Sequence, residues 1–527
     1  MISNPVIPGF NPDPSIVRVG EDYYLACSTF EWYPGVAIYH SKDLVNWELI
    51  TFPLNEERLL DMRGVPDSCG VWAPCLSYDE GKFYLVYSNV KSFDGIWKDT
   101  PNYLTTAESI HGPWSDPVYL GSEGFDGSMF HDVDGRKWYL SMIVDHREGL
   151  FFGGIILKEY STTFQRCIGE TYKIFEGTEL GKTEGPHIYM HNGWYYLLTA
   201  EGGTEYGHAV TITRSKDIKG PYKVHPKNPI LTAAHNLDHP IQRSGHGDLV
   251  WDEEGECYLF FLGSRPLDGH RACVLGRETC IEKVEWGEGE DDWPTIEEGR
   301  LPKIELDIKG LTQSGNRNEL INFNEEPLSI HYQSLRQAVD SSWCIWDRDN
   351  GRLLLRGRDS LSSCFDQSLL ARRLQSFNIE YEVSFIFEPD HFQQMAGVVC
   401  YYNTGHHLYI HCAGVEDVDK KVIEVNAMVN FELKRLIEPI QINQSDELKI
   451  RVHWQQDKIK ASYQLNDSDF LDLDFTFGAH VLSDDFVREG GQRYRPAFTG
   501  SMIGIACQDL SGEGKSAAFN YLKYTEL

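Results

Sequence analysis

The sequence predicts an all-β protein in which a five-bladed β-propeller is followed by a β-sandwich of the concanavalin or jelly-roll kind. Three observations predict this: one segment recurs five times, turns rich in Gly, Asn and Asp separate short strands, and the pattern changes after about residue 309. Long stretches of 3.6-residue periodicity are absent, which disfavours helical repeats. The 527 residues exceed what one hydrophobic core usually serves, so two large domains are expected.

The recurring segment is a turn followed by an aromatic-rich strand. It reads EDYYLACS at 21–28, GKFYLVYS at 81–88, RKWYLSMI at 136–143, GWYYLLTA at 193–200 and ECYLFFLG at 256–263. The aligned tyrosines, Tyr24, Tyr84, Tyr139, Tyr196 and Tyr258, are 60, 55, 57 and 62 residues apart. Four short strands with their turns fit each step, as in a propeller blade. A β-sandwich with chance internal similarity is the alternative.

The second domain begins where the repeat stops. We expect residues 1–309 to form the propeller, residues 310–324 a linker and residues 325–527 the sandwich. Alternating segments without helical periodicity support the sandwich. They lie at 352–355, 379–387, 397–402, 448–453 and 504–507.

Composition excludes several classes of partner. Lys plus Arg is 48 against 79 for Asp plus Glu, which gives a formal net charge of −31. This charge repels nucleic acid and anionic membrane surfaces. No apolar run approaches the roughly 18 residues that span a bilayer, and residues 1–10 lack the pattern of a signal peptide, so we expect a cytoplasmic protein. The twelve cysteines are scattered without a CxxC pair and are expected to be mostly buried apolar residues.

One position in each repeat carries a side chain suited to chemistry. Between 11 and 13 residues before the aligned tyrosines stand Asp13, Trp72, Asp126, Glu184 and His246. We place each in the innermost strand of its blade, beside Gly or Pro residues that bend or end the strand at the channel mouth. A single acidic residue in so acidic a chain would most simply be a solvated surface group. Three at one blade position indicate a site.

Three carboxylates in one partly dry pocket can divide the roles that glycoside hydrolysis requires. Such groups raise one another's pKa, which separates a base from an acid. We assign Asp13 as the general base and Glu184 as the general acid. Asp126 would keep Glu184 protonated and orient it. In an inverting enzyme the two acting carboxyls lie roughly 6.5–9.5 Å apart.

Five longer motifs in order carry a resemblance to a known family. They are NPVIPGFNPDPSIVRVGEDYYLACSTFEWYPGV from residue 4, GVWAPCLSY around Trp72, GFDGSMFHD around Asp126, KTEGPHIY around Glu184 and LGRET around Arg277. The chain resembles glycoside hydrolase family 43 nearly end to end, in particular the family's two-domain β-xylosidases. The resemblance implies an exo-acting, inverting enzyme that releases xylose from the non-reducing end of xylo-oligosaccharides, with the same roles for the three carboxylates.

The resemblance also implies residues that bind the substrate. Phe30 and Trp72 would pack against the terminal sugar, Arg277 would bind its hydroxyls, and Phe498 would close the pocket from a loop of the second domain. His246 matches a channel histidine that in some members binds hydrated calcium, and no other cofactor is implied. Dimers or tetramers are implied as well. Without the resemblance, Arg277 would be interpreted as part of a structural salt bridge and His246 as a buried, hydrogen-bonded residue.

Two positions depart from the family pattern, and three other functions remain open. Cys75 stands where an Asp is usual, and Val144 stands where close relatives often carry an aromatic residue. An α-L-arabinofuranosidase, or an enzyme with both activities, would fit the same residues. A retaining, fructan-acting propeller would typically show Asn-Asp-Pro-Asn instead of Asn-Pro-Asp-Pro. A non-catalytic sugar-binding propeller would keep the aromatic side chains but would need neither Asp13 nor Glu184.

Overall fold

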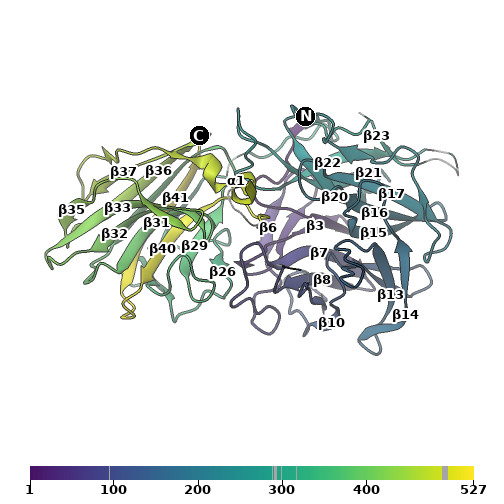
Figure 1. Cartoon of the computed structure of the whole chain (residues 1–527), viewed down its shortest axis with the longest axis horizontal. Coiled ribbons are helices and arrows are strands. Elements are labelled where there is room, and N and C mark those ends of the chain that lie inside the picture. Colours follow the sequence, from purple (N-terminus) through teal and green to yellow (C-terminus); the bar gives the residue numbers. More distant parts are fainter. Residues whose placement is uncertain are drawn as a thin grey trace. The chain divides into compact units, whose positions relative to one another are not determined.

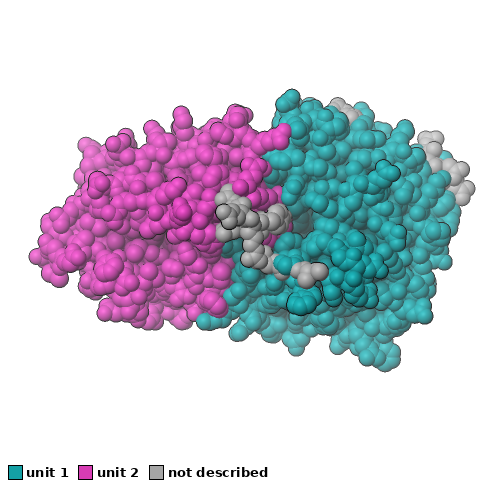
Figure 2. Space-filling model, viewed as in Figure 1, with its two compact units in different colours: residues 1–265, 277–314 teal, residues 266–276, 315–527 magenta. Residues whose placement is uncertain are grey.

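The computed structural model describes residues 1–93, 95, 97–287, 289, 293–297, 299–315, 317–489 and 496–527. The chain forms two compact units (Figures 1 and 2). Unit 1 contains residues 1–265 and 277–314, and unit 2 contains residues 266–276 and 315–527. The boundaries differ from the predicted ones. The residues expected to form a linker divide between the units, and residues 266–276, from the last part of the propeller sequence, belong to unit 2.

Unit 1 is a β-propeller of five antiparallel blades that follow one another along the sequence. Blade 1 contains β2 (Ser15–Val19), β3 (Asp22–Cys27), β5 (Ala37–Ser41) and β6 (Glu48–Thr51). Blade 2 contains β7 (Gly70–Asp79), β8 (Lys82–Val90), β9 (Asn102–Ala107) and β10 (Val118–Gly121). Blade 3 contains β11 (Ser128–His131), β12 (Lys137–Met142), β13 (Ile155–Ser161) and β14 (Arg166–Phe175).

Blades 4 and 5 complete the ring. Blade 4 contains β15 (Glu184–His191), β16 (Trp194–Glu201), β17 (Ala209–Ser215), β18 (Lys223–Val224) and β19 (Leu231–Thr232). Blade 5 contains β20 (Gln242–Trp251), β21 (Cys257–Ser264), β22 (Glu278–Glu285) and β23 (Thr295–Ile296). The short β4 (Trp32–Tyr33) follows β3, and β1 (Ile2–Ser3) pairs with β24 (Glu305–Leu306), so the two ends of the unit 1 sequence meet.

The predicted repeat is confirmed as the second strand of every blade. The five aligned tyrosines lie on β3, β8, β12, β16 and β21, each opposite a residue of the first strand. Tyr84 and Tyr139 share one hydrophobic cluster, while Tyr196 and Tyr258 belong to two others. Four of the tyrosines therefore recur because each fills a core between sheets, while the half-buried Tyr24 packs 5.4 Å from Phe83 of blade 2, between ring centroids.

Strand direction places one set of loops beside the candidate site. Within a blade, successive strands are antiparallel, so the start of the first strand and the loop between the second and third strands lie at the same end. The five candidate residues lie at or near the starts of the first strands. The loops after β3, β8, β12, β16 and β21 are consequently at the candidate end of the propeller.

Unit 2 is a β-sandwich of two antiparallel sheets, shown green to yellow in Figure 1. The first sheet contains β25 (Glu319–Asn322), β27 (Cys344–Asp347), β28 (Arg352–Arg356), β30 (Asn378–Ile386), β36 (Leu448–Gln455), β37 (Lys458–Leu465), β38 (Leu471–Asp472), β39 (Phe477–Gly478) and β41 (Ser516–Glu526). The second contains β29 (Ser368–Arg373), β31 (Gln394–Asn403), β32 (His406–Gly414), β33 (Lys420–Val429), β34 (Glu432–Arg435), β35 (Ile440–Asn443) and β40 (Met502–Asp509). The short elements β26 (Ser334–Leu335), η1 (Ala479–Leu482) and α1 (Asp484–Glu489) also belong to this unit.

The segment 266–276, which we call the arm, joins unit 2 through its apolar side chains. Leu267, Val274 and Leu275 are buried in the same hydrophobic core as the sandwich strands. The backbone amide of Ser501 donates a hydrogen bond of 2.8 Å to the carbonyl of Val274. Apolar burial of this kind explains why the arm leaves the propeller between β21 and β22. Across the described residues, no helix is long and apolar enough to cross a membrane.

Candidate active site

The three carboxylates stand at one blade position, but not all of them lie inside a strand. Glu184 is the first residue of β15, whereas Asp13 and Asp126 precede β2 and β11 by two residues. The predicted placement in the innermost strand is therefore wrong for both aspartates. The reason is conformational: their φ angles are 56° and 55°, in the left-handed region that a strand cannot continue.

The same backbone irregularity recurs in blades 4 and 5. His246 lies inside β20 with a φ of 45°, and Gly185, next to Glu184, has a φ of 56°. A Cβ atom on Gly185 would lie 3.0 Å from the His246 imidazole, so glycine also permits close approach there. The strand registers shift beside Trp72, Glu184 and His246. Bulges and left-handed residues of this kind re-aim side chains, and they concentrate near functional sites.

Asp13 is held as a carboxylate by its neighbours. The hydroxyl of Ser28 donates to Oδ2 at 2.6 Å, and Nη1 of Arg277 donates to Oδ1 at 3.0 Å. Burial would raise the pKa of Asp13, but the Arg277 guanidinium, His246 and the Ser28 hydroxyl together outweigh it, so the pKa is lowered. Asp13 therefore stays ionised at neutral pH.

Glu184 has the opposite character. Burial and the nearby Asp13 carboxylate raise the pKa of Glu184 to about 8, against the opposing charges of Arg277 and Lys182. Part of the Glu184 side chain remains open to solvent. Burial raises the pKa of Asp126 as well, reinforced by Glu184 and Asp13. Glu184 and Asp126 thus favour the protonated form, whereas the neighbouring Asp13 favours the ionised form.

Asp126 is tied to the backbone next to Glu184. Its Oδ2 accepts a hydrogen bond of 3.2 Å from the amide of Gly185. The contact links the start of β11 to the start of β15, so it fixes the two carboxyl-bearing segments relative to each other. This is the geometry expected of a residue that orients the acid.

His246 lies among the carboxylates but does not form a direct metal site with them. Its Nδ1 is 3.7 Å from Oδ1 of Asp13 and 4.0 Å from Oδ2 of Asp126. Burial lowers the pKa of His246 to about 4, only partly offset by Asp13, so the imidazole is neutral at pH 7. Within the described part of the chain, the one cluster of possible metal-ligating groups is in unit 2, at Cys273, Asp484 and Asp485. The oxygen-rich direct shell that calcium prefers is thus not assembled around His246.

Arg277 connects three blades. Besides Asp13 of blade 1, its Nη1 donates to Oγ1 of Thr204 at 3.0 Å, in the loop after β16 of blade 4. Its guanidinium carbon lies 5.4 Å from the ring centroid of Phe30. The predicted residues Arg277 and Phe30 are thus adjacent to the candidate base. Arg277 itself precedes β22 of blade 5.

Sequence reasoning missed Ser28 and Thr204. Ser28 is the last residue of the first repeated segment, four residues after Tyr24, so the repeat already pointed to its position. Thr204 lies in the segment GGTEYGH at 202–208, between the second and third strands of its blade. Any polar residue in such a loop was a candidate once the propeller was predicted, because these loops surround the channel mouth.

Aromatic rings line one side of the site. Trp72 lies 6.2 Å from Phe30 and 5.1 Å from Phe125, measured between ring centroids, and its Nε1 donates to the carbonyl of Ser68. Phe125 directly precedes Asp126. Trp72 is therefore fixed in place between Phe30 and Phe125.

The other predicted residues have different surroundings. Phe498 belongs to unit 2, where the Arg488 guanidinium is 5.5 Å from its ring centroid, and its part in closing the pocket stays a prediction. Cys75 is buried on β7, and burial raises the pKa of its thiol to about 12, so this position carries no charge. Val144 lies in the loop after β12, with its amide bonded to the carbonyl of Glu123.

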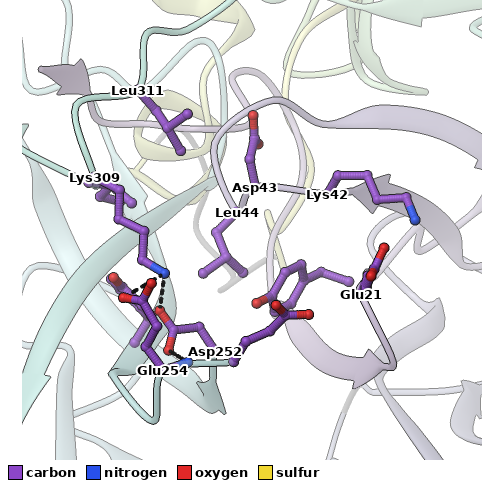
Figure 3. Close-up of a pocket in the computed structure, with 12 residues that line it drawn as sticks. Glu21, Lys42, Asp43, Leu44, Asp252, Glu254, Lys309 and Leu311 are labelled. Carbon is purple, nitrogen blue, oxygen red and sulfur yellow. Dashed lines mark hydrogen bonds and ion pairs between the residues drawn. The ribbon is translucent and has the colours of Figure 1, made fainter.

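A separate hollow of about 360 Å³ lies at the other end of unit 1, beside the turns between first and second strands of blades 1 and 5. Nζ of Lys309 lies 2.9 Å from a carboxylate oxygen of Asp252 and 3.3 Å from one of Glu254 in its lining (Figure 3). The acid and base chemistry belongs to the channel mouth.

Comparisons with known proteins agree with this geometry. The family model for glycosyl hydrolases family 43 matches residues 2–294, and the model for the beta xylosidase C-terminal concanavalin A-like domain matches residues 321–525. A curated relative from Humicola insolens, Xylosidase/arabinosidase 43B, is 43% identical over 99% of this chain and 97% of its own. A beta-xylosidase from Bacillus subtilis (strain 168) is 44% identical over 100% of this chain and 99% of its own.

A solved structure extends the similarity to the whole fold. The crystal structure of xylan beta-1,4-xylosidase from Bacillus halodurans C-125 has a TM-score of 0.95 and 44% sequence identity, covering 100% of both chains. The predicted resemblance is confirmed by matches of both kinds. Two family models that together span most of the sequence, and relatives that cover nearly all of it, show that this protein belongs to family 43 of the glycosyl hydrolases.

Proposed function

We propose that the protein is an exo-acting, inverting 1,4-β-xylosidase that releases xylose from the non-reducing end of xylo-oligosaccharides. The observation that carries the mechanism is the opposed pKa shifts of Asp13, which is lowered, and Glu184, which is raised to about 8. The similarity to proteins named as xylosidases supports the substrate.

In the proposed reaction, ionised Asp13 takes a proton from a water molecule. The water oxygen attacks the anomeric carbon of the terminal sugar while the glycosidic bond breaks on the opposite side. Glu184 gives its proton to the departing oxygen, and the products are xylose with inverted anomeric configuration and an oligosaccharide one unit shorter. Burial and the Asp13 carboxylate keep Glu184 protonated, and Asp126 orients Glu184 through the segment at Gly185.

The substrate contacts follow from the same arrangement. Trp72 and Phe30 would pack against the terminal sugar, and the remaining donors of Arg277 would bind its hydroxyls. We also propose that Phe498 of unit 2 closes the pocket, which would account for removal of single sugars from a chain end. Release of longer fragments from xylohexaose would contradict this.

An α-L-arabinofuranosidase activity, alone or beside the first, is the second candidate. It is favoured by the 43% identity to a relative named Xylosidase/arabinosidase 43B. Product analysis on xylobiose, xylotriose and arabinosylated xylo-oligosaccharides separates the two. Xylose released from the non-reducing end supports the first proposal, and arabinose released in large excess would favour the second. Proton NMR of the first-formed sugar tests inversion, because retention would contradict the roles of both carboxyl groups.

The pH dependence of kcat/KM should be bell-shaped. Activity requires Asp13 to be ionised, so it rises as the pH passes the lowered pKa of this group. Activity also requires Glu184 to be protonated, so it falls above a pKa of about 8. Initial rates on xylobiose at low concentration across pH 3–10 measure both limbs. An alkaline limb unchanged in Glu184→Gln, measured on residual activity, would contradict this assignment.

Replacement of Arg277 by Met should shift the acid limb. The guanidinium lowers the pKa of Asp13, so its removal raises that pKa and moves the acid limb of kcat/KM to higher pH. Loss of hydrogen bonds to the sugar should also lower kcat/KM by roughly 100-fold, from about 3 kcal/mol for a charged donor. Arg18→Met, which removes an exposed ion pair with Glu253 far from the channel mouth, is the control. An unshifted acid limb would show that Arg277 does not set the pKa of Asp13.

A further proposal concerns calcium. Calcium, if bound at His246, would be held through water molecules, and no step of the reaction is assigned to it. Thermal unfolding of the protein after chelation, with and without added calcium, tests this binding.

We also propose a homodimer or homotetramer in the cytoplasm. Sedimentation velocity measures the assembly, and fractionation of the source cells tests the location.

A further inference from the structure

Loops of blades 2 and 3 bring further aromatic side chains to the catalytic end of unit 1. Phe93 lies in the loop after β8, and Phe151 and Phe152 lie in the loop after β12. Both loops join second to third strands, so they lie at the end of the propeller that carries the catalytic carboxyl groups. The roles assigned above leave these three rings without a function.

The three rings continue the aromatic wall that begins beside the acid pair. Phe93 lies 5.0 Å from Trp72, and Phe151 lies 6.1 Å from Phe125, between ring centroids. Phe93 and Phe151 are 5.4 Å apart, and Phe151 and Phe152 are 4.6 Å apart. Trp72 and Phe125 are buried, whereas Phe93, Phe151 and Phe152 are half-buried. Aromatic surface therefore extends from the residue preceding Asp126 to positions that solvent reaches.

A lysine braces the outer part of this wall. Nζ of Lys98 lies 4.3 Å from the ring centroid of Phe93 and 5.0 Å from that of Phe151. The ammonium donates to the carbonyls of Phe93 and Gly95, the latter at 2.7 Å. Cation–π attraction to two rings from different blades holds the loops together. A pre-ordered platform binds a sugar with less loss of side-chain freedom than a mobile one.

The hairpin that carries Phe151 also contains Val144. The amide of Asp145 bonds to the carbonyl of Leu150 at 2.8 Å, and the amide of Ile143 bonds to that of Gly154 at 2.9 Å. Val144 therefore lies across the hairpin from Phe151 and Phe152. The aromatic surface of this hairpin therefore comes from Phe151 and Phe152, on the side opposite Val144.

We propose that Phe93, Phe151 and Phe152 form the platform for the leaving sugar, the second pyranose from the non-reducing end, with Phe151 as its principal contact. This inference rests on the proposed xylosidase function. The glycosidic oxygen must lie beside Glu184, so the leaving sugar extends outward from the carboxyl groups toward the channel mouth. Pyranose rings present apolar C–H faces, which pack on aromatic rings. The open aromatic surface next to the acid pair suits such a face.

The test compares two substrates that differ only in the leaving group. Xylobiose has a leaving sugar, whereas β-D-xylosyl fluoride has none. Phe151→Ala should lower kcat/KM for xylobiose by about tenfold, the value of one good aromatic contact, and leave that for the fluoride within about twofold. Phe151→Tyr should retain activity on both. Phe164→Ala is the matched control, because Phe164 is exposed in the same blade at the turn between β13 and β14.

Each other outcome overturns the inference. Equal losses on both substrates would mean that Phe151 supports the catalytic centre in general, and an unchanged value for xylobiose would mean that it does not touch the leaving sugar. If circular dichroism shows that Phe151→Ala is unfolded, Phe151→Leu is judged by the same criteria. A wild-type enzyme inactive on both substrates would instead contradict the proposed function.

Discussion

Replacement of Asp13 by Asn should lower kcat by roughly 10³- to 10⁴-fold on every xyloside, the range of a lost general base. An amide of the same shape can still accept the hydrogen bond from Ser28, but it cannot take a proton from water. A better leaving group does not help, because the attacking water still lacks its base. Xylobiose and β-D-xylosyl fluoride should therefore lose activity together.

The same variant offers a second measurement. The Asp13 carboxylate raises the pKa of Glu184, so its neutralisation should lower that pKa from about 8. Carbon-13 NMR of labelled glutamate side chains can follow this titration without any turnover. Asp134→Asn, in the exposed turn between β11 and β12, is the control and should keep wild-type activity. If Asp13→Asn hydrolysed xylobiose at more than a tenth of the wild-type rate, Asp13 would be excluded as the base.

Replacement of Glu184 by Gln should separate the two substrates. Xylobiose needs a proton on its departing oxygen, so its kcat should fall by roughly 10³-fold. Fluoride leaves without that proton, and its rate should fall by less than about tenfold. The alkaline limb of the pH profile for xylobiose, measured on the residual activity, should also vanish, because the group that titrates near pH 8 is gone.

Glu179→Gln provides the matched control for this experiment. Glu179 is exposed in the loop that leads to β15, five residues before Glu184. Its amide variant should keep both rates and the alkaline limb. Equal and large losses of both substrates in Glu184→Gln would indicate a structural role or a role in the attack on the anomeric carbon.

The propeller could be predicted because the residues that repeat in its sequence are also residues that pack between its blades. The aligned tyrosines occupy equivalent places on the second strands, and four of the five are buried in cores between sheets, so the sequence repeats them. The catalytic position could be predicted for the same reason, since Asp13, Asp126 and Glu184 hold equivalent places around one channel. The sandwich was recognisable from alternation alone, although its strand pairing was not.

The loops do not follow the sequence repeat, and the features that could not be predicted lie in them. Thr204 lies in a loop whose sequence does not follow the repeat, so only its hydrogen bond to Arg277 identifies it. The left-handed backbone of Asp13 and Asp126 could not be read from residues that prefer ordinary conformations. The arm was hidden because Leu267, Val274 and Leu275 stand inside the propeller sequence, and only their burial in the core of unit 2 shows where they belong.

The arm also limits how this protein can be shortened. A gene cut after residue 314 would produce every strand of the propeller, yet it would retain Leu267, Val274 and Leu275 without the core that covers them. Such a product would expose an apolar loop, prone to aggregation, immediately before Arg277. Protein engineers who want the propeller alone should therefore replace residues 266–276 with a short polar turn in the same step. Eleven residues, 266–276, thus lie within the propeller sequence but belong to the other folding unit.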